Sequence, residues 1–475
     1  MVFSSTLFTF GFLPIVILVY YLAKERYRNY ILLVASLFFY SCGEPQFIVI
    51  MLISIAVNYL LALGIDHFEH VTTRRLLLVA AIIENLGILY VFKYLDFSIN
   101  IINRMFHAKI ALPGITLPIG ISFFTFQTMS YVIDVYRKKV DVQKNIFYVA
   151  LYISFFPQLI AGPIVRYATI AEQIEKRTTS LEKFGEGARR FMLGFCKKVI
   201  LANNLALVAE IPFSSASEEI VTYSAAMLWL GSISYTLQIF YDFSGYSDMA
   251  IGLGKMFGFT FEENFNYPYI SKSVTEFWRR WHISLGQWFR DYVYIPLGGS
   301  RVGTCRHIFN LLVVWLLTGL WHGANDTFVA WGLGYFILLV IEKYLIKPES
   351  RKWKPVQILW QIVTLVCVNF GWVIFNASGI KFGINYCLGM IGFFGNGFAI
   401  DAEVLRLCRE YGFYIVAGIL FSTPLMKWLG QKFDRVMWIK SAKTIVLPLG
   451  YMIIFLWAVS FLILGAHNPF IYFNF

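Results

Sequence analysis

The sequence predicts an all-α polytopic membrane protein, and three features of its composition indicate this class. Of the 475 residues, 58% are hydrophobic and only 14% are charged, whereas a soluble domain carries about 25% charged residues. Aromatic residues make up 18%, which suits lipid-facing surfaces and interfacial belts. Stretches such as Ile48–Ala56 are apolar on nearly every side, which excludes a transmembrane barrel of alternating strands. We expect one membrane domain over residues 1–475, with about 11 to 12 transmembrane helices plus re-entrant and interfacial helices.

The first part of the chain contains apolar segments separated by basic loops. Five transmembrane helices are expected at Leu7–Leu22, Tyr30–Ser41, Phe47–Ile65, Leu76–Val91 and Leu117–Tyr136. Lys and Arg follow the first, third and fifth segments, and basic loops face the cytoplasm, so the N-terminus is expected outside. Because the basic cluster follows the first apolar run, we interpret that run as a helix and not as a cleaved signal peptide.

The next apolar segment, Ile146–Pro163, lies between two basic stretches. It contains Pro157 and Pro163, which disrupt a regular helix. A full crossing would place the second basic stretch outside, so we expect a re-entrant segment that enters the membrane and returns. Irregular backbone at that depth is tolerated only where protein or a water-filled cavity surrounds it. The segment therefore predicts a cavity on the cytoplasmic side.

A pair of segments flanking DFSGYSD is expected to cross and return. Ser224–Tyr241 would cross outward, and Met249–Phe257 would continue the return path. The Gly and Ser residues between them indicate a turn. Asp242 and Asp248 are expected to cap the adjacent helix, and the alternative is that they line a tunnel. The following block, residues 261–305, repeats aromatic and basic residues and is expected to lie along the membrane interface.

Residues 308–346 are expected to form a hairpin with WHGAND at its tip. Ile308–Leu320 would rise only about 20 Å, against a hydrocarbon core about 30 Å thick. His322 would then lie inside the bilayer or towards its outer half, and Phe328–Ile346 would return to a basic loop. The last expected spans are Ile358–Phe375, Tyr411–Leu425 and Ile445–Leu464, and a partial entry is expected at Ile384–Phe394.

The net charge of +12 is best explained by the membrane. Lys and Arg cluster between apolar segments, as expected for loops that face anionic lipid, and no nucleic-acid partner is predicted. The six cysteines lack a CxxC pattern and are expected to be free thiols. The seven histidines are scattered, so no metal site is predicted.

Two histidines are candidates for chemistry. His322 could be a catalytic base, a proton relay or a packed side chain, since imidazole titrates near neutral pH and can accept a hydroxyl proton. His282, in FWRRWHISL, taken alone favours a structural role in which it bonds a backbone carbonyl. Charge pairs are expected between two acids, Glu276 and Asp291, and the arginines Arg279, Arg280 and Arg290. The GxSxG, P-loop, HExxH and GxGxxG patterns are absent.

Several stretches together resemble the membrane-bound O-acyltransferase (MBOAT) family, most closely its bacterial alginate O-acetyltransferase branch. They read LPIGISFFTFQTMSYVIDVYR (117–137), FFPQLIAGPIVR (155–166), GFCKKVILANNLA (194–206), YTLQIFYDFSGYSDMAIGLGKMFGF (235–259), ENFNYPY (263–269), VTEFWRRWHISLGQWFRDYVYIPLGGSR (274–301), LWHGANDTF (320–328) and NPFIYFNF (468–475). The resemblance implies a ring of membrane helices around a funnel or tunnel, with a catalytic core at about residues 115–346. It implies His322 as the main catalytic residue and His282 as the second. Asn203 departs from the pattern, because similar proteins often carry Asp there.

The function implied is transfer of an acetyl group from a cytoplasmic thioester, with acetyl-CoA as donor and no permanently bound cofactor. The acceptors would be an extracytoplasmic acetyltransferase or carrier protein and finally a cell-surface polysaccharide such as alginate, at the bacterial inner membrane. Candidates for contacts with the donor are Arg279, Arg280 and Arg290, with Asn325 and Trp321 as candidate oxyanion donors. Two alternatives remain open: D-alanyl transfer to teichoic acid, and a transporter or channel without covalent chemistry.

Overall fold

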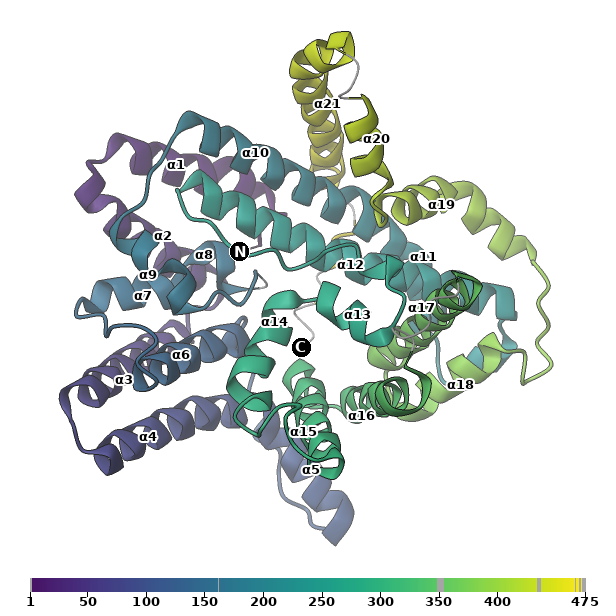
Figure 1. Ribbon diagram of the computed structural model, residues 1–475. Coiled ribbons are helices and arrows are strands. Elements are labelled where there is room, and N and C mark those ends of the chain that lie inside the picture. The colour runs from purple at the N-terminus through teal and green to yellow at the C-terminus, as the bar shows by residue number, and fades with distance from the viewer. Residues whose placement is uncertain are drawn as a thin grey trace. The chain divides into compact units, whose positions relative to one another are not determined.

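The computed structural model describes residues 2–160, 162–347, 354–433, 437–465, 467–469 and 471. All regular structure within these ranges is helical (Figure 1), which confirms the all-α class. The chain divides into two compact units. Unit 1 comprises Met1–Phe191 and Tyr246–Glu262, and unit 2 comprises Met192–Gly245 and Glu263–Phe475.

Among the described residues, seven helical segments are long and apolar enough to cross a membrane, which confirms a polytopic membrane protein. They are Ile48–His67, Val71–Phe106, Leu181–Phe213, Thr304–His322, Asp326–Ile346, Lys354–Asn376 and Val446–Ile463. A bent pair, Ala402–Phe421 with Leu425–Lys432, raises the number to eight if it is one span. Seven or eight segments are fewer than the 11 to 12 transmembrane helices expected, partly because some apolar helices, such as Leu7–Leu22, are shorter than the segments named above.

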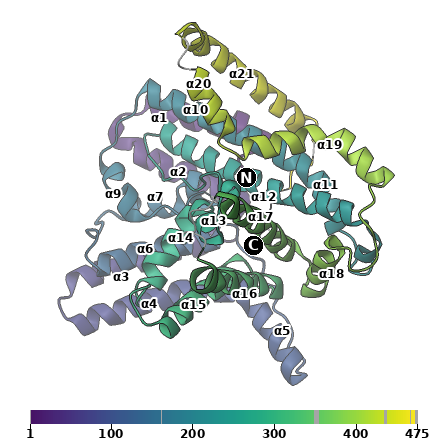
Figure 2. The ribbon, with the colours of Figure 1, turned by 45° about the vertical axis from the view of Figure 1, so that its right-hand side comes forward.

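Unit 1 is built from short and medium-length helices. They are α1 (Leu13–Leu22, preceded by π-helical Leu7–Phe12), α2 (Glu25–Gly43), α3 (Ile48–His67), α4 (Val71–Leu89, followed by π-helical Tyr90–Tyr94), α5 (Leu95–Phe106), α6 (Ile121–Tyr136), α7 (Ile146–Ser154), α8 (Phe156–Leu159), α9 (Tyr167–Glu175) and most of α10 (Leu181–Cys196). Helices α3, α4 and α6 pack against one another, as both ribbon views show (Figure 2).

Polar side chains join α3 to α4 within their apolar surroundings. The Asn58 amide donates a hydrogen bond to the Glu84 carboxylate at 2.7 Å, and the Asn85 amide donates to Asn58 Oδ1 at 2.7 Å. Without a hydrophobic driving force between helices in lipid, such bonds and close packing hold helices together.

The predicted interruption within residues 146–163 is confirmed. Helix α7 ends at Ser154, and α8 is a single turn that contains Pro157. The chain passes close to α6 at this point, because a Cβ at Gly120 would lie 2.7 Å from the Leu159 carbonyl oxygen. Gly120 also has a positive φ of 78°, which glycine adopts without steric cost.

Unit 2 contains the longer and more buried helices. They are the end of α10 with π-helical Lys197–Ala202, α11 (Asn203–Phe213), α12 (Ala225–Met256, whose last turns belong to unit 1), α13 (Val274–Arg280), α14 (Ile283–Phe289, followed by π-helical Arg290–Tyr294), α15 (Thr304–His322), α16 (Asp326–Ile341, followed by π-helical Glu342–Ile346), α17 (Lys354–Asn376), α18 (Ile380–Met390), α19 (Ala402–Phe421), α20 (Leu425–Phe433) and α21 (Met437–Ile463). Short 3₁₀ turns lie at Ile220–Thr222 and Pro268–Ile270.

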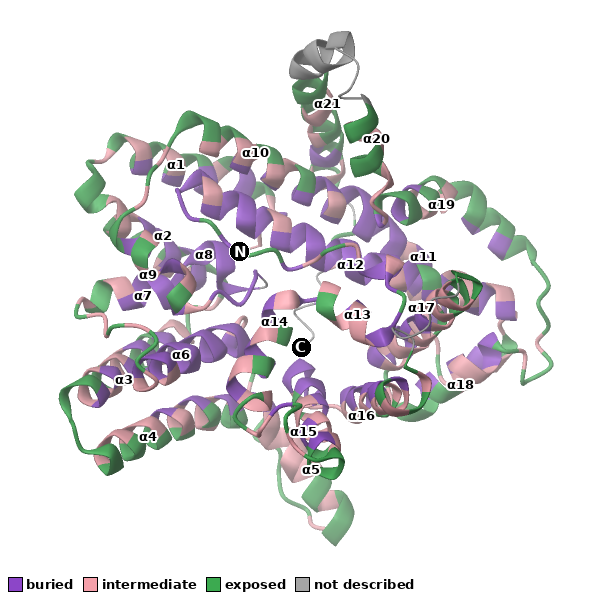
Figure 3. Ribbon diagram, viewed as in Figure 1, coloured by how far each residue is buried: buried purple, intermediate pink, exposed green. Residues whose placement is uncertain are grey.

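The predicted turn at DFSGYSD is wrong, because α12 is one helix of 32 residues. It is among the most buried helices (Figure 3). Its small residues permit close packing: a Cβ at Gly245 would lie 2.7 Å from the Gly194 carbonyl oxygen. Asp242 and Asp248 are therefore not helix caps. Lys198 Nζ lies 2.7 Å from Asp242 Oδ1, and in unit 1 Arg190 Nη2 lies 2.8 Å from Asp248 Oδ1.

A further helical segment, at residues 181–213, is long enough to cross a membrane and was not predicted. Its basic residues indicated a cytoplasmic loop, yet α10, the π-helical segment and α11 follow one another there. Its most apolar stretch is 78% buried inside the protein, so a cation in this path can meet protein partners and not lipid. Lys198, for example, is 2% exposed.

The 308–346 hairpin is confirmed, but α15 is longer than predicted. It has 19 residues and ends at His322, so it rises about 28 Å, close to the thickness of a hydrocarbon core. Helices α15 and α16 cross at small residues. A Cβ at Gly319 would lie 2.5 Å from the Phe328 carbonyl oxygen, and one at Gly332 would lie 2.5 Å from that of Trp315.

Candidate functional site

His322 lies in a cage of aromatic rings within unit 2. Its exposed fraction is 5%. The ring centroids of Trp321, Trp331 and Phe375 lie 4.9, 5.1 and 5.0 Å from that of the imidazole. Because these residues come from α15, α16 and α17, three helices fix the position of this histidine.

The glycine after His322 is required by the same packing. Gly323 has extended backbone, and a Cβ there would overlap the ring of Phe328. That ring packs 4.9 Å from Phe375 and 6.4 Å from His322, between centroids. The WHG sequence is therefore a structural unit, in which glycine leaves room for the aromatic cage.

His282 lies at the break between α13 and α14, so the expected interfacial helix over residues 261–305 is interrupted there. Its backbone is left-handed, with φ 45° and ψ 53°, a conformation uncommon for residues with a side chain. Its Nδ1 lies 3.2 Å from Asn264 Oδ1. The same oxygen accepts hydrogen bonds from the Ser284 hydroxyl at 2.9 Å and backbone N–H at 3.2 Å. His282 thus bonds a side-chain amide and not the backbone carbonyl expected from its sequence position alone.

This contact sets the chemistry of the imidazole. The Asn264 oxygen is an acceptor, so the neutral ring carries its proton on Nδ1 and keeps the lone pair on Nε2. Nε2 is buried and has no hydrogen-bond partner among the described residues. Burial lowers the pKa of His282 from its usual 6.5 to about 3. The ring is therefore neutral at pH 7, with Nε2 unprotonated.

Trp321 connects the two candidate histidines. Its ring centroid lies 5.7 Å from that of His282 and 4.9 Å from that of His322. The ring of Phe243 packs edge-on against His282 at 4.6 Å. The two histidines, 40 positions apart in the sequence, thus share one indole neighbour.

A cavity of about 550 Å³ reaches His282. Its apolar wall includes Trp278, Trp281, Leu285, Phe289 and Trp315. Its basic lining residues, besides His282, are Arg279, Arg290, His307 and Lys343. His322, Trp321 and Asn325 are not among the lining residues. The cavity thus joins a buried neutral imidazole to a basic group.

His307 is central to that basic group. Its Nε2 lies 2.7 Å from the Tyr294 hydroxyl and 3.2 Å from Lys343 Nζ, and its Nδ1 lies 2.7 Å from the Tyr344 hydroxyl. This cluster was not predicted, because its members are separated by up to 50 positions in the sequence. Asn264, which orients His282, was missed for the same reason.

The expected charge pairs are confirmed. Arg280 lies 2.8 Å from Glu276, and Arg290 lies 2.7 Å from Asp291. Arg279 and Arg290 line the cavity, whereas Arg280 does not. Asn325 caps α16, since its side-chain oxygen accepts a hydrogen bond from the Thr327 N–H at 3.4 Å.

Indole and phenol rings surround the site. Trp278 packs at 4.9 Å against Trp315 and Tyr335, and Trp281 packs at 4.8 Å against Trp372, between centroids. Such a wall excludes water from part of the site, which strengthens the electrostatic interactions of polar groups inside it. The six cysteines are free thiols, as expected. The part of the chain that the structure describes contains no group of three or more His, Cys, Asp or Glu placed for a metal ion.

Comparison with known proteins identifies related chains. Residues 120–378 match the MBOAT, membrane-bound O-acyltransferase family, and both candidate histidines lie in this range. The chain is 45% identical over 388 residues to the probable alginate O-acetylase AlgI of Pseudomonas aeruginosa, covering 80% of this chain and 73% of that protein. It is 32% identical over 527 residues to the peptidoglycan O-acetyltransferase of Helicobacter pylori, covering 100% and 98%. The teichoic acid D-alanyltransferase of Bacillus subtilis is 28% identical over 278 residues, covering 55% and 69%.

Proposed function

Because the chain belongs to the membrane-bound O-acyltransferase family, and is a multi-pass membrane acyltransferase, we propose that it transfers an acetyl group from a cytoplasmic thioester for O-acetylation of an extracytoplasmic polysaccharide. One observation carries this proposal. The buried, neutral imidazole of His282 lines a cavity that cationic side chains also line, and it packs against Trp321, the same indole that packs against His322. A base and a site for an anionic donor are the two components that acyl transfer from a phosphorylated thioester requires.

In the proposed reaction, an imidazole accepts the proton of an acceptor hydroxyl as its oxygen attacks the thioester carbonyl. The carbon–oxygen bond forms, the carbon–sulfur bond breaks, and the departing thiolate takes the proton. His322 is the proposed base, and His282 is the second candidate for this role or for relay of the proton. The Trp321 indole N–H or the Asn325 amide is proposed to stabilise the oxyanion that forms on the carbonyl oxygen.

Acetyl-CoA is the proposed donor. Its phosphates would meet Arg279, Arg290 and Lys343, whose positive charges line the cavity that reaches His282. Arg280 is a weaker candidate, since it lies outside that lining. Basic loops at the ends of apolar segments support entry from the cytoplasm, and hence a place in the bacterial inner membrane.

The proposed final acceptor is a cell-surface polysaccharide, reached through an extracytoplasmic acetyltransferase or carrier protein. Support for acetyl over D-alanyl transfer comes from relatives, because the acetyltransferases are 45% and 32% identical and cover more of the chain than the 28% identical D-alanyltransferase. Alginate and peptidoglycan, named in the acetyltransferase relatives, are the two acceptors to compare first.

The proposal is tested with full-length protein in proteoliposomes supplied with acetyl-labelled CoA thioester and partner-containing membranes. Wild type is expected to release thiol and label the polysaccharide, and His322→Ala to lose about a hundredfold or more of the rate, as expected for a general base. The exposed histidine variant His70→Ala serves as the matched control. Normal labelling by His322→Ala would refute the role of His322, and substrate movement without thiol release would instead establish a transporter.

A further inference from the structure

Unit 1 contains a second polar cavity, of about 610 Å³, formed by residues of α1, α2, α7, α9 and α10 and of the segments that follow α9 and α12. Five cations line it, Arg26, Arg28, Lys176, Arg177 and Lys183, together with two carboxylates, Glu25 and Glu175. Five cations against two carboxylates leave a formal excess of three positive charges. None of these residues belongs to the histidine site of unit 2.

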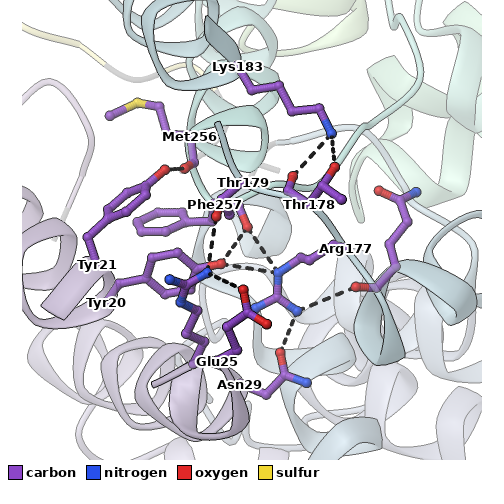
Figure 4. A network of polar contacts seen from close by, with 12 residues as sticks. Tyr20, Tyr21, Glu25, Asn29, Arg177, Thr178, Thr179, Lys183, Met256 and Phe257 are labelled. Carbon is purple, nitrogen blue, oxygen red and sulfur yellow. Dashed lines mark hydrogen bonds and ion pairs between the residues drawn. The ribbon is translucent and has the colours of Figure 1, made fainter. Parts of the chain in front are cut away.

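One end of the cavity is built on the C-terminal end of α12 (Figure 4). The Tyr20 hydroxyl donates to the Phe257 carbonyl at 2.8 Å, and the Tyr21 hydroxyl donates to that of Met256 at 2.6 Å. Arg177 Nε donates to the Phe257 carbonyl at 3.0 Å. A helix C-terminus carries partial negative charge and free carbonyls, which these donors satisfy. This end of the cavity is therefore rigid.

Three of the five cations are positioned by neutral acceptors. Arg28 Nη1 donates to the Thr179 hydroxyl at 3.0 Å, and Lys183 Nζ donates to the Thr178 hydroxyl at 2.8 Å (Figure 4). Arg177 Nη1 donates to the Asn29 amide oxygen at 2.6 Å. Hydroxyl and amide oxygens hold these groups in place without cancelling their charge. Arg28 Nη1 also forms an ion pair with Glu25 Oε1 at 3.7 Å, but the Glu25 side chain is 88% exposed, so solvent screens the attraction.

We propose that this cavity binds the phosphate group of an anionic membrane lipid. Preorganised guanidinium and ammonium groups match phosphate oxygens in charge and hydrogen-bond geometry. A phosphodiester headgroup would supply the negative charge that the lining lacks, and the polar side chains of Asn29, Gln173 and Thr178 also line the cavity.

The neighbours of the lining residues favour a lipid over a soluble phosphate compound. Leu22, Tyr30 and Phe147 are 78%, 39% and 53% exposed, and each lies within two positions of a lining residue. The rings of Tyr30 and Phe147 pack at 5.7 Å between centroids. Exposed aromatic and aliphatic side chains of this kind lie at the level of lipid headgroups, where basic clusters attract anionic lipid.

The test uses full-length protein in mixed micelles containing phosphatidylglycerol or phosphatidylcholine, with retained lipid measured by native mass spectrometry. Wild type is expected to retain phosphatidylglycerol selectively. The double variant Arg26→Gln/Lys176→Gln removes two exposed cations from the lining and is expected to bind it about thirtyfold more weakly, since each cation near an anionic lipid contributes roughly a factor of five.

The control is Arg75→Gln/Lys144→Gln, which removes the same charge from exposed positions outside the cavity and is expected to bind as wild type does. Equal retention of the two lipids, or equal losses in the two double variants, would overturn the proposal. Adenosine 3′,5′-bisphosphate is added as a competitor, and displacement of the lipid at equal concentration would overturn the lipid as ligand in favour of a soluble phosphate compound. Binding is measured without acetyl transfer, so the result does not depend on the proposed reaction.

Discussion

Asn264 holds the imidazole of His282 in one tautomer, through a single acceptor oxygen shared with Ser284. Asn264→Ala is expected to lower the acyl-transfer rate by about tenfold or more, because the Nε2 lone pair would no longer be fixed for proton transfer. The rate is measured as thiol release at saturating donor, with folding checked by thermal unfolding. Ser284→Ala, which keeps the Asn264 oxygen, should retain most of the rate. Equal losses in both variants would show that this hydrogen bond is structural only.

The lowered pKa of His282 predicts a pH dependence of stability. The unfolded imidazole titrates near 6.5 and the folded one near 3, so protonation favours unfolding. The free energy of unfolding has its full value above pH 6.5 and decreases as the pH falls towards 3. The decrease due to His282 is about 2 kcal/mol at pH 5. His282→Asn, which tolerates left-handed backbone, should flatten this part of the profile of thermal midpoint against pH. Parallel profiles for wild type and variant would contradict the prediction.

Lys343 is expected to recognise donor phosphates. Lys343→Gln should raise the KM for acetyl-CoA about tenfold, with little change in kcat, because a charge-assisted hydrogen bond to phosphate is lost. The same variant should use S-acetylpantetheine, which lacks phosphates, as wild type does. A similar loss with both donors would assign Lys343 to the structure of the His307 cluster instead.

The two catalytic candidates were found from sequence, and their supporting residues were not. His282 and His322 lie in recognisable motifs, whereas Asn264 and Lys343 contribute through contacts made across 18 and 36 positions. A motif marks which residue type is required at one place. It does not show which side chain, distant in the sequence, fixes the tautomer of a catalytic histidine or supplies a charge beside it.

Among the helices, the crossing of α15 and α16 depends on Gly319 and Gly332. Gly332→Ala is expected to destabilise the protein by about 1–3 kcal/mol, because its Cβ would overlap the Trp315 carbonyl and separate the helices. Gly334→Ala in the same helix is the matched control, since its Cβ would meet no atom within 4 Å. The measurement is the thermal midpoint in detergent. Similar midpoints for the two variants would show that the crossing can relax.

The buried pair of Lys198 and Asp242 also joins Pro469 and Ile471 to α12. Asp242 Oδ2 accepts a hydrogen bond from the Ile471 N–H at 3.0 Å, and Lys198 donates to the Pro469 carbonyl. Asp242→Asn is expected to cost about 3–5 kcal/mol, because it leaves a buried cation without its counter-charge. The double variant Lys198→Met/Asp242→Leu should recover part of this loss in thermal unfolding. A double variant that is less stable than the single one would show that the pair is favourable in itself.

Helix α12 also explains why the turn predicted at DFSGYSD was wrong. Apolar, lipid-facing helices such as α3 and α17 were predicted within a few residues, because lipid requires a long apolar segment. Helix α12 is surrounded by protein, where Gly, Ser and paired charges are accommodated. The same residues in a soluble loop would form a turn, so composition alone does not separate the two cases.

Across the whole molecule, the positive-inside pattern predicts the sidedness of exposed cysteines. Cys42 ends α2 opposite its basic start, and Cys305 begins α15 between Arg301 and Arg306. A membrane-impermeant maleimide is expected to label single-cysteine Cys42 protein in intact cells and single-cysteine Cys305 protein only in inside-out vesicles. Labelling of both from the same side would refute the predicted topology.

The fold class and family followed from sequence, because hydropathy and the combined motifs extend over most of the chain. The ring of helices around a funnel, the single domain over residues 1–475 and the catalytic core at about 115–346 stay predictions. The basic block at 166–198 shows why a topology by charge alone is incomplete, since it combines exposed loop cations with the buried Lys198.

The indole cluster of unit 2 provides a built-in optical probe. Six of the 13 tryptophans, Trp278, Trp281, Trp315, Trp321, Trp331 and Trp372, pack on one another or on the candidate histidines. Three of them, Trp278, Trp281 and Trp315, also line the cavity, so an occupant would change the polarity around them. Intrinsic fluorescence can therefore follow occupation of this cavity in unlabelled protein, and a Trp278→Phe protein would identify how much of the signal arises there.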